Sequence, residues 1–430
     1  MNKIILVAIL LSFFISGSFV TVFNSVSAAE LIEDSWSTKS SMAHGQKWFE
    51  IVTFDDKIYT IGGEKDGLDV GFTQQYDTKT DKWTTLANMP TSRIHFGTVI
   101  YENKIYCIGG EVPYVGPVFV SQAIDVVEVY DPVTNTWSEK ASVPTTMSRP
   151  MTCVINNQLF VITYDGQMYM YNSSKDRWST KASIPVSTTN MNARVLNDQI
   201  FVICSSGAEW SMFMYNQATD SWIKKADPTV LYGLFDFIVA GNQIIMCDIP
   251  MYVNNAPLNF RIYDPETDKW REGQTVTKLM PNYCRFVGAT SGVYAPENVY
   301  VFGGEQIDGY NGKAFAWFYD IVGDVWSTAK TLPIPTMISS VSLVVVDDIF
   351  YLIGEYGAVR QYVPIGYNPQ GYPTPTSSSN INTSFVSSEP SGSFLTGPVV
   401  AIMGLTVGGV VAIISLVFLY KRKEKKKQTV

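Results

Sequence analysis

The chain contains few of the side chains from which catalytic and metal sites are usually built. Its 430 residues include only two histidines, His44 and His95. None of the cysteines belongs to a Cys-x-x-Cys pair or to another metal-ligand spacing. A Ser/His/Asp order, a glycine-rich phosphate loop and a paired acidic site are missing as well. We therefore predict no cofactor, no metal site and no catalytic residue.

Nucleic acid is a poor partner for this chain, because most of its length is acidic. The net charge is −8, and residues 30–420 carry −14 once the +5 of the last ten residues and the +1 of Lys3 are removed. We expect the cysteines, mostly on apolar segments, to be small buried side chains, although an oxidising compartment permits one or two disulfides. The five are Cys107, Cys153, Cys204, Cys247 and Cys284.

A repeated pair of aromatic residues dominates what is present. A Tyr is followed by Asp or Asn and, seven residues after the Tyr, by a Trp. Six copies occur: Tyr76/Trp83, Tyr130/Trp137, Tyr171/Trp178, Tyr215/Trp222, Tyr263/Trp270 and Tyr319/Trp326. Successive Trp residues are 54, 41, 44, 48 and 56 residues apart. This period is typical of propeller repeats rather than of shorter helical or leucine-rich repeats.

Each copy has the residue pattern of a β-hairpin. In the copy around Tyr130, Asp131 starts a turn through its side chain, and the ring of Pro132 fixes its own φ near the value that the second position of the turn needs. Asn135 tolerates the left-handed conformation that closes such turns. The second strand then begins near Trp137, whose large ring can fill the space between two stacked sheets.

A wholly apolar segment precedes each hairpin, and there are seven such segments in all. Strands without polar alternation are buried on both faces, as expected where sheets stack around an axis. A two-residue polar turn lies just before each segment and joins it to a preceding strand. The segments are 58–61, 105–108, 159–162, 200–203, 244–247, 299–302 and 349–352.

These residues resemble the Kelch repeat family, whose units carry a Gly pair, a Tyr-Asp and a Trp in that order. The resemblance covers roughly 34–362, and Gly pairs follow three of the apolar segments, at 62–63, 109–110 and 303–304. The other four segments lack the Gly pair. The resemblance implies an all-β fold, in which residues 30–365 form one domain, a seven-bladed Kelch-type β-propeller.

Seven apolar segments but only six Tyr-to-Trp hairpins leave the last blade one strand short. Trp36 stands before the first apolar segment and has no Tyr seven residues earlier. We predict that the strand around Trp36 pairs with the strand around Tyr362 and closes the ring without an exposed edge.

Both ends of the chain carry targeting signals. Residues 1–29 have the charge, apolar core and small-residue site of a signal peptide cleaved near Ala28 or Ala29, and the alternative is an uncleaved anchor. A stalk rich in Pro, Ser and Thr (366–396) precedes a transmembrane helix (397–420) and a basic tail (421–430). Because basic residues stay on the cytoplasmic side, we expect a single-pass cell membrane protein with the propeller outside. Asn172 and Asn382 lie in glycosylation patterns.

Two classes of function fit this sequence. We favour a non-catalytic module that binds a cell-surface or extracellular protein or glycan. The alternative is a surface carbohydrate-active enzyme, since the resemblance includes galactose-oxidase-like copper enzymes and sugar epimerases. A copper site there needs two His in register, whereas His44 lies 18 residues before its Gly pair and His95 only 14.

The predicted binding face follows from strand alternation. In a four-stranded antiparallel blade, the second-to-third and blade-to-blade connections share one face, which we name the variable face. The first-to-second and third-to-fourth turns, which are short and uniform, share the opposite face, which we name the turn face. Arg, Tyr and amide groups gather at the variable face, with Arg93, Arg149 and Arg285 as expected anchors. The alternative for about half of the set is that they satisfy buried backbone groups around the channel. The candidate residues are Arg93, His95, Arg149, Asn190, Tyr232, Tyr283, Arg285, Tyr114 and Tyr310.

Overall fold

The computed structural model describes most of the propeller region. The described residues are 31–113, 121–188, 190–206, 209–228, 235–248, 259–274, 285–304, 314–332, 341–354 and 357–372. They belong to one compact unit that extends to Thr374. The predicted signal peptide, transmembrane helix and basic tail lie outside them, as does the stalk beyond Tyr372. Within the described residues, no helix has the length and apolar character needed to cross a membrane.

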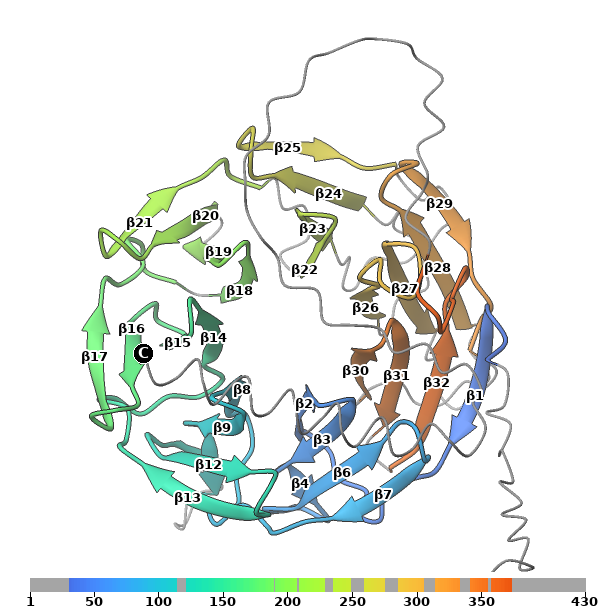
Figure 1. Ribbon diagram of the computed structural model, residues 1–430. Helices are drawn as coiled ribbons and strands as arrows, with labels where there is room; N and C mark the ends of the chain where they lie inside the picture. The colour runs from blue at the N-terminus through green and yellow to red at the C-terminus, as the bar shows by residue number, and fades with distance from the viewer. Residues whose placement is uncertain are drawn as a thin grey trace, which may run out of the picture. The chain divides into compact units, whose positions relative to one another are not determined.

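Seven four-stranded antiparallel sheets surround a central axis, as the sequence predicted (Figure 1). Blade 1 contains β2 (Glu50–Phe54), β3 (Lys57–Ile61), β6 (Thr73–Asp77) and β7 (Lys82–Thr85). Blade 2 contains β8 (Gly97–Tyr101), β9 (Lys104–Ile108), β12 (Val127–Asp131) and β13 (Thr136–Lys140). Blade 3 contains β14 (Met151–Ile155), β15 (Gln158–Ile162), β16 (Met168–Asn172) and β17 (Arg177–Lys181).

The remaining blades repeat the order from the inner to the outer strand. Blade 4 contains β18 (Asn190–Leu196), β19 (Gln199–Ser206), β20 (Glu209–Asn216) and β21 (Ser221–Lys224). Blade 5 contains β22 (Phe235–Ala240), β23 (Gln243–Asp248), β24 (Asn259–Asp264) and β25 (Lys269–Glu272). Blade 6 contains β26 (Arg285–Ala289), β27 (Asn298–Gly304), β28 (Ala314–Asp320) and β29 (Val325–Thr328). Blade 7 contains β30 (Val341–Val346), β31 (Ile349–Gly354), β32 (Val359–Val363) and β1 (Ser35–Lys39).

The hydrophobic core is divided among the interfaces between neighbouring blades. Seven clusters of buried side chains lie there, one for each pair of adjacent blades. At the interface of blades 7 and 1, for example, Ile58 and Tyr76 pack with Tyr351 and Ile353. The second strand of each blade contributes to the cores on both of its faces, which explains why these segments lack polar alternation.

The Tyr-to-Trp hairpin fastens each blade to the blade before it. In blade 2, the Tyr130 hydroxyl and the backbone N–H of Ala87 both donate to Asn135 Oδ1, each at 2.8 Å. Trp137 Nε1 donates to the carbonyl oxygen of the same Ala87, also at 2.8 Å. One residue that follows the outer strand of blade 1 is therefore held at both its N–H and its C=O. We name this arrangement the latch.

The latch recurs around the ring. Its Asp or Asn always stands two residues before the Trp and has a positive φ, between 44° and 54°. In every copy the Trp indole N–H donates to a carbonyl oxygen of the preceding blade. In blade 6 the side-chain oxygen of Gln274 also accepts from the backbone N–H of Trp326. The carbonyls bonded are those of Ser40, Ala87, Ala141, Ala182, Ala226, Gln274 and Lys330.

The predicted closure by the N-terminal strand is confirmed. β1 pairs antiparallel with β32, and Trp36 lies opposite Tyr362. Tyr362 donates to Asp34 Oδ1 at 2.9 Å, and the Lys330 N–H donates to the same oxygen at 2.7 Å. The seventh latch is thus assembled from the two ends of the domain, which is why Trp36 has no Tyr seven residues before it.

The Gly pairs are explained by close backbone contacts beneath the variable face. Gly63 has a φ of +104°, and a Cβ there would lie 2.6 Å from the carbonyl oxygen of Lys47. Gly110 has a φ of +105°, and its Cβ would lie 2.8 Å from the carbonyl oxygen of Ile94. Both contacts hold the segment that enters an inner strand against the second-to-third connection.

The four cysteines that the structure describes carry free thiols and are buried, as expected. Burial raises the pKa of the Cys153 thiol to about 12. Cys284 lies outside the described residues. The described thiols are those of Cys107, Cys153, Cys204 and Cys247.

Deletion of residues 30–41 is expected to remove β1 and the seventh latch. This exposes the edge of β32, where Tyr362 is now fully buried. We expect loss of the cooperative thermal transition, or aggregation, measured by calorimetry and light scattering. A chain that ends at Thr374 keeps the whole compact unit and should melt normally. An unchanged melting curve after the deletion would show that β1 does not close the ring.

Asp176→Ala is expected to destabilise the protein by about 1–3 kcal/mol, because the Ala141 N–H and the Tyr171 hydroxyl lose their acceptor. Asp176→Asn should retain most of the stability at neutral pH, since Asn135 performs the same role in blade 2. Chemical denaturation measures both. Equal losses in the two variants would contradict the latch.

The same pair of variants tests the charge of the latch. The Ala141 N–H, and then the Tyr171 hydroxyl, hold the pKa of Asp176 below its usual 3.8. The ionised carboxylate therefore stabilises the folded state above about pH 4, and this contribution is lost as the pH falls through the lower folded-state value. Denaturation curves below pH 4 should converge for the wild type and Asp176→Asn.

Candidate functional site

Two kinds of connection meet on the variable face. Short hairpins rise from the second-to-third connections of blades 1 and 2, and each is bridged to the segment that enters its blade. The bridges join Lys47 with Glu64 and Ile94 with Glu111. The hairpins are β4 (Glu64–Lys65) with β5 (Leu68–Asp69), and β10 (Glu111–Pro113) with β11 (Ser121–Ala123).

Three residues on this face have an unusual backbone conformation. Among the described residues, 22 other than glycine have a positive φ, and all but four of these are Asp or Asn. One of the four, Glu102, belongs to a two-residue turn. The other three are Trp48, His95 and Arg149, with φ of 55°, 54° and 51°. Bulky side chains rarely adopt this conformation, and its cost is tolerated most often at functional sites.

These three residues occupy equivalent places in consecutive blades. Each stands two residues before an inner strand, namely β2, β8 or β14. The residue that follows each is buried, and so is the residue two positions before it, as with Phe96 and Arg93 around His95. Because the backbone is fixed by buried groups on both sides, the intervening side chain is directed to the surface.

The three side chains line one hollow of about 770 Å³ beside the inner strands of blades 1 to 4. Arg149 Nη2 lies 3.1 Å from His95 Nε2, and the ring centroids of Trp48 and His95 are 6.1 Å apart. Since guanidinium groups only donate, His95 Nε2 accepts and the ring proton sits on Nδ1, 3.5 Å from Glu111 Oε1. Trp48 is 47% exposed, so its ring is available to a ligand.

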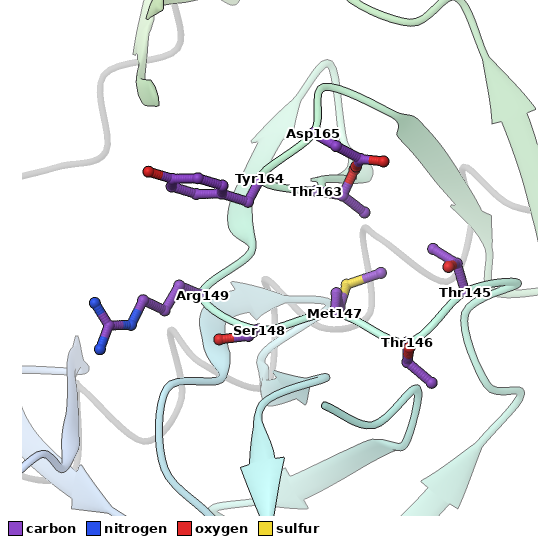
Figure 2. Close-up of a pocket in the computed structure, with 8 residues that line it drawn as sticks. All are labelled: Thr145, Thr146, Met147, Ser148, Arg149, Thr163, Tyr164 and Asp165. Atoms are coloured by element: carbon purple, nitrogen blue, oxygen red, sulfur yellow. The ribbon is translucent and has the colours of Figure 1, made fainter. Parts of the chain in front are cut away.

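Arg149 also lines a second pocket, of about 410 Å³, over blade 3. Figure 2 shows Arg149 and Tyr164 extending to the same side, with Thr145 and Thr146 on the other side of the pocket. Tyr164 is 43% exposed. Arg149 therefore stands between two adjacent hollows of the same face.

Arg93 is not a surface anchor, which corrects the expectation from the sequence. Its side chain is 0% exposed and forms an ion pair with Glu128. It also donates to the carbonyl oxygens of Thr91 and Cys107, each at 3.1 Å, while Glu128 accepts from Thr91. A guanidinium this deeply buried needs these partners, so Arg93 supports the segment that presents His95.

The other predicted residues are distributed differently. Asn190 begins β18, is partly buried and does not line either hollow. Arg285 begins β26, but its side chain lies outside the described residues. So do Tyr114, Tyr232, Tyr283 and Tyr310. Of the nine candidates, the structure brings His95 and Arg149 together.

Three residues of the hollow were missed by the sequence analysis. Glu50 and Arg194 lie on the inner strands β2 and β18, and Trp48 precedes β2. A charged residue within an inner strand, such as Glu50 or Arg194, was a sequence signal that could have identified two of them. Alignment of the segments that enter each blade would also have placed Trp48 beside His95 and Arg149.

Burial and charge alter the acid–base behaviour of this site. Burial raises the pKa of Glu50 to about 7, and the nearby Arg149 guanidinium opposes the shift. Burial, and then Arg149, lower the pKa of His95, against the effect of Glu111. Near neutral pH, Glu50 is therefore divided between its two protonation states, whereas His95 is mainly neutral.

The two histidines are not brought together as a metal pair. The His44 ring stacks on Phe72 with centroids 4.6 Å apart, while His95 contacts Arg149 and Trp48. Within the described part of the chain, no group of three or more His, Cys, Asp or Glu side chains is placed to hold a metal ion.

Glu50→Gln is expected to change how stability depends on pH. Because the pKa of Glu50 in the folded state is about 7 and its ordinary value is 4.5, ionisation opposes folding. Stability of the wild type should therefore fall, relative to the variant, as the pH rises from about 4.5 to about 7, and the difference should level off above that pH. Melting temperatures between pH 4.5 and 8 measure this difference. Glu139→Gln, on the exposed outer strand β13, is the control, and parallel curves for all three proteins would refute the assignment.

Two family models agree with the propeller geometry. The family model described as Kelch motif matches residues 49–90 and 92–144. The family model described as DUF6242 beta propeller domain matches residues 131–364, more than half of the chain. No curated protein matches. A solved structure titled "Structure of YjhT" aligns at 14% identity over 67% of this chain and 99% of its own, with a TM-score of 0.46. The chain belongs to the Kelch-repeat β-propeller family.

Proposed function

We propose that this protein is a non-catalytic binding module whose protein or glycan ligand docks on the variable face, at the hollow bounded by Trp48, His95 and Arg149. One observation carries the proposal. Three consecutive blades place a bulky residue in the left-handed conformation at the same position, and all three side chains line one hollow. Asp or Asn would fit this backbone with less strain, so the side chains themselves are the reason for the arrangement.

The chemistry of the hollow supports recognition. Trp and Arg are the residues most enriched among those that dominate binding energy at interfaces. Trp48 is half exposed, with Lys47 Nζ 4.4 Å from the centre of its ring. Arg149 is exposed, and its guanidinium lies at hydrogen-bond distance from His95.

The end of the propeller supports display of this face away from an anchor. The N–H groups of Asn368 and Tyr372 donate to the carbonyl oxygens of Tyr294 and Val293, each at 2.7 Å. These acceptors belong to the turn that joins β26 and β27, on the turn face. The last described residues therefore lie on the turn face, opposite the variable face. We propose a single-pass cell membrane protein with its propeller outside and its C-terminus in the cytoplasm.

Capture experiments with the propeller (30–374) test the proposal. Trp48→Ala and Arg149→Ala should each weaken binding of cell-surface proteins or glycans by tenfold or more, because truncated anchors typically lose about 2 kcal/mol. Arg177→Ala, an exposed Arg that begins the outer strand of blade 3, is the matched control. Folded site variants that bind as the wild type does would refute the assignment of the face. Stoichiometric copper, or turnover of a sugar by the purified protein, would replace this proposal with the enzymatic one.

A further inference from the structure

More basic than acidic side chains line the hollow, and this excess indicates the charge of the ligand. Two guanidinium groups, from Arg149 and Arg194, and one carboxyl group, from Glu50, line it. Arg194 is held on its own strand, where Nη1 donates to Asn192 Oδ1 at 2.7 Å. Arg149 has no carboxylate within ion-pair distance among the described residues and keeps most of its donors for a ligand.

Glu50 is the group that can change this balance. It begins β2 and is partly buried beside the hollow. The structure shows no ion pair between Glu50 and any described basic residue, so its carboxylate is not neutralised by direct contact. Desolvation therefore favours its protonated form, in agreement with its raised pKa.

The other groups around Glu50 do not replace it as the titrating group near neutral pH. His95 is mainly neutral there, and guanidinium groups do not lose their proton in proteins. The Cys107 thiol of β9 is buried, and burial raises its pKa well above the neutral range. β30, which also packs against β2, has no titratable side chain. Lys57 and Tyr59 of β3 and Tyr101 of β8 are the remaining titratable residues on the strands adjacent to β2.

We propose that the hollow binds an anionic group of the ligand through Arg149, and that Glu50 takes up a proton when this group binds. The proposal rests on the proposed function and deepens it by naming the ligand chemistry and its control by pH. An ionised Glu50 repels the incoming anion, whereas a protonated Glu50 does not and can donate a hydrogen bond to it. Where Glu50 is ionised before binding, it takes one proton from solvent when the anion binds. Binding is therefore tighter at pH 6 than at pH 8.

A small ligand pair tests this without knowledge of the natural ligand. Benzoate offers a carboxylate for Arg149 and a ring for Trp48, and benzamide has the same shape without the charge. The reporter is the NMR signal of His95 in ¹³C-histidine-labelled protein. The chain has only two His, so the His44→Gln variant identifies which signals belong to His95. The propeller (30–374) is titrated at constant ionic strength at pH 6 and pH 8, with phenyl phosphate as a second anion.

We expect benzoate to shift the His95 signals with a dissociation constant about tenfold lower at pH 6 than at pH 8. Glu50→Gln should bind at both pH values with nearly equal affinity, and Arg149→Gln should abolish binding. Arg177→Gln, on the outer strand of blade 3, should bind as the wild type does. If phenyl phosphate binds more tightly than benzoate, the anionic group is a phosphate rather than a carboxylate.

Three results would overturn the inference. Benzamide that binds as well as benzoate removes the need for an anion, and benzoate that does not shift His95 at either pH shows that the hollow has no anion site. A pH dependence that persists in Glu50→Gln assigns the proton to another group. These results are separate from the capture experiment, because a macromolecular ligand can dock on the variable face without an anion at Arg149. Melting curves confirm that each variant is folded.

Discussion

The latch between neighbouring blades is the interaction on which the rest of the structure depends. A single blade buries its second strand only when another blade covers each face, so the ring is stable only if it closes. The Trp indole N–H donates to the carbonyl oxygen of one residue in the preceding blade, and the side-chain oxygen of the Asp or Asn accepts from the N–H of the same residue. The seventh latch, between Asp34 and Tyr362, extends this rule to the two ends of the domain.

The latch also explains why the two faces of the propeller differ. Its hairpins and the two-residue inner turns have fixed geometry, so nearly all of the described non-glycine residues with positive φ on the turn face are Asp or Asn. The variable face carries no such requirement. There the segments entering blades 1 to 3 hold Trp48, His95 and Arg149 in the conformation that Asp and Asn adopt elsewhere. Strain on one face, beside regularity on the other, is the feature on which the proposed binding site rests.

Arg93 and Arg149 show how a shared residue type can have opposite roles. Both stand just ahead of inner strands, and the sequence suggested the same role for both. Arg93 points into the blade, where Glu128 neutralises it, whereas Arg149 points to the surface and meets His95. The two positions differ by two residues in their distance from the strand, and the left-handed conformation at His95 and Arg149 breaks the alternation between them. The sequence alone does not reveal that register, because the turn before the strand changes the alternation.

The sequence by itself determined the propeller, its seven blades and the closing strand, because these follow from local and periodic features. A Tyr, a turn residue and a Trp at fixed spacing define a hairpin wherever they occur, and counting hairpins against apolar segments identified the missing strand. Only the tertiary structure decided the site. Glu50, Arg149 and Arg194 are far apart in the chain and belong to three blades, and the packing of neighbouring inner strands in blades 1 to 4 brings them to one hollow. The proton affinity of Glu50 was equally inaccessible, since it depends on burial and on the position of Arg149, neither of which is a property of the residues next to it in sequence.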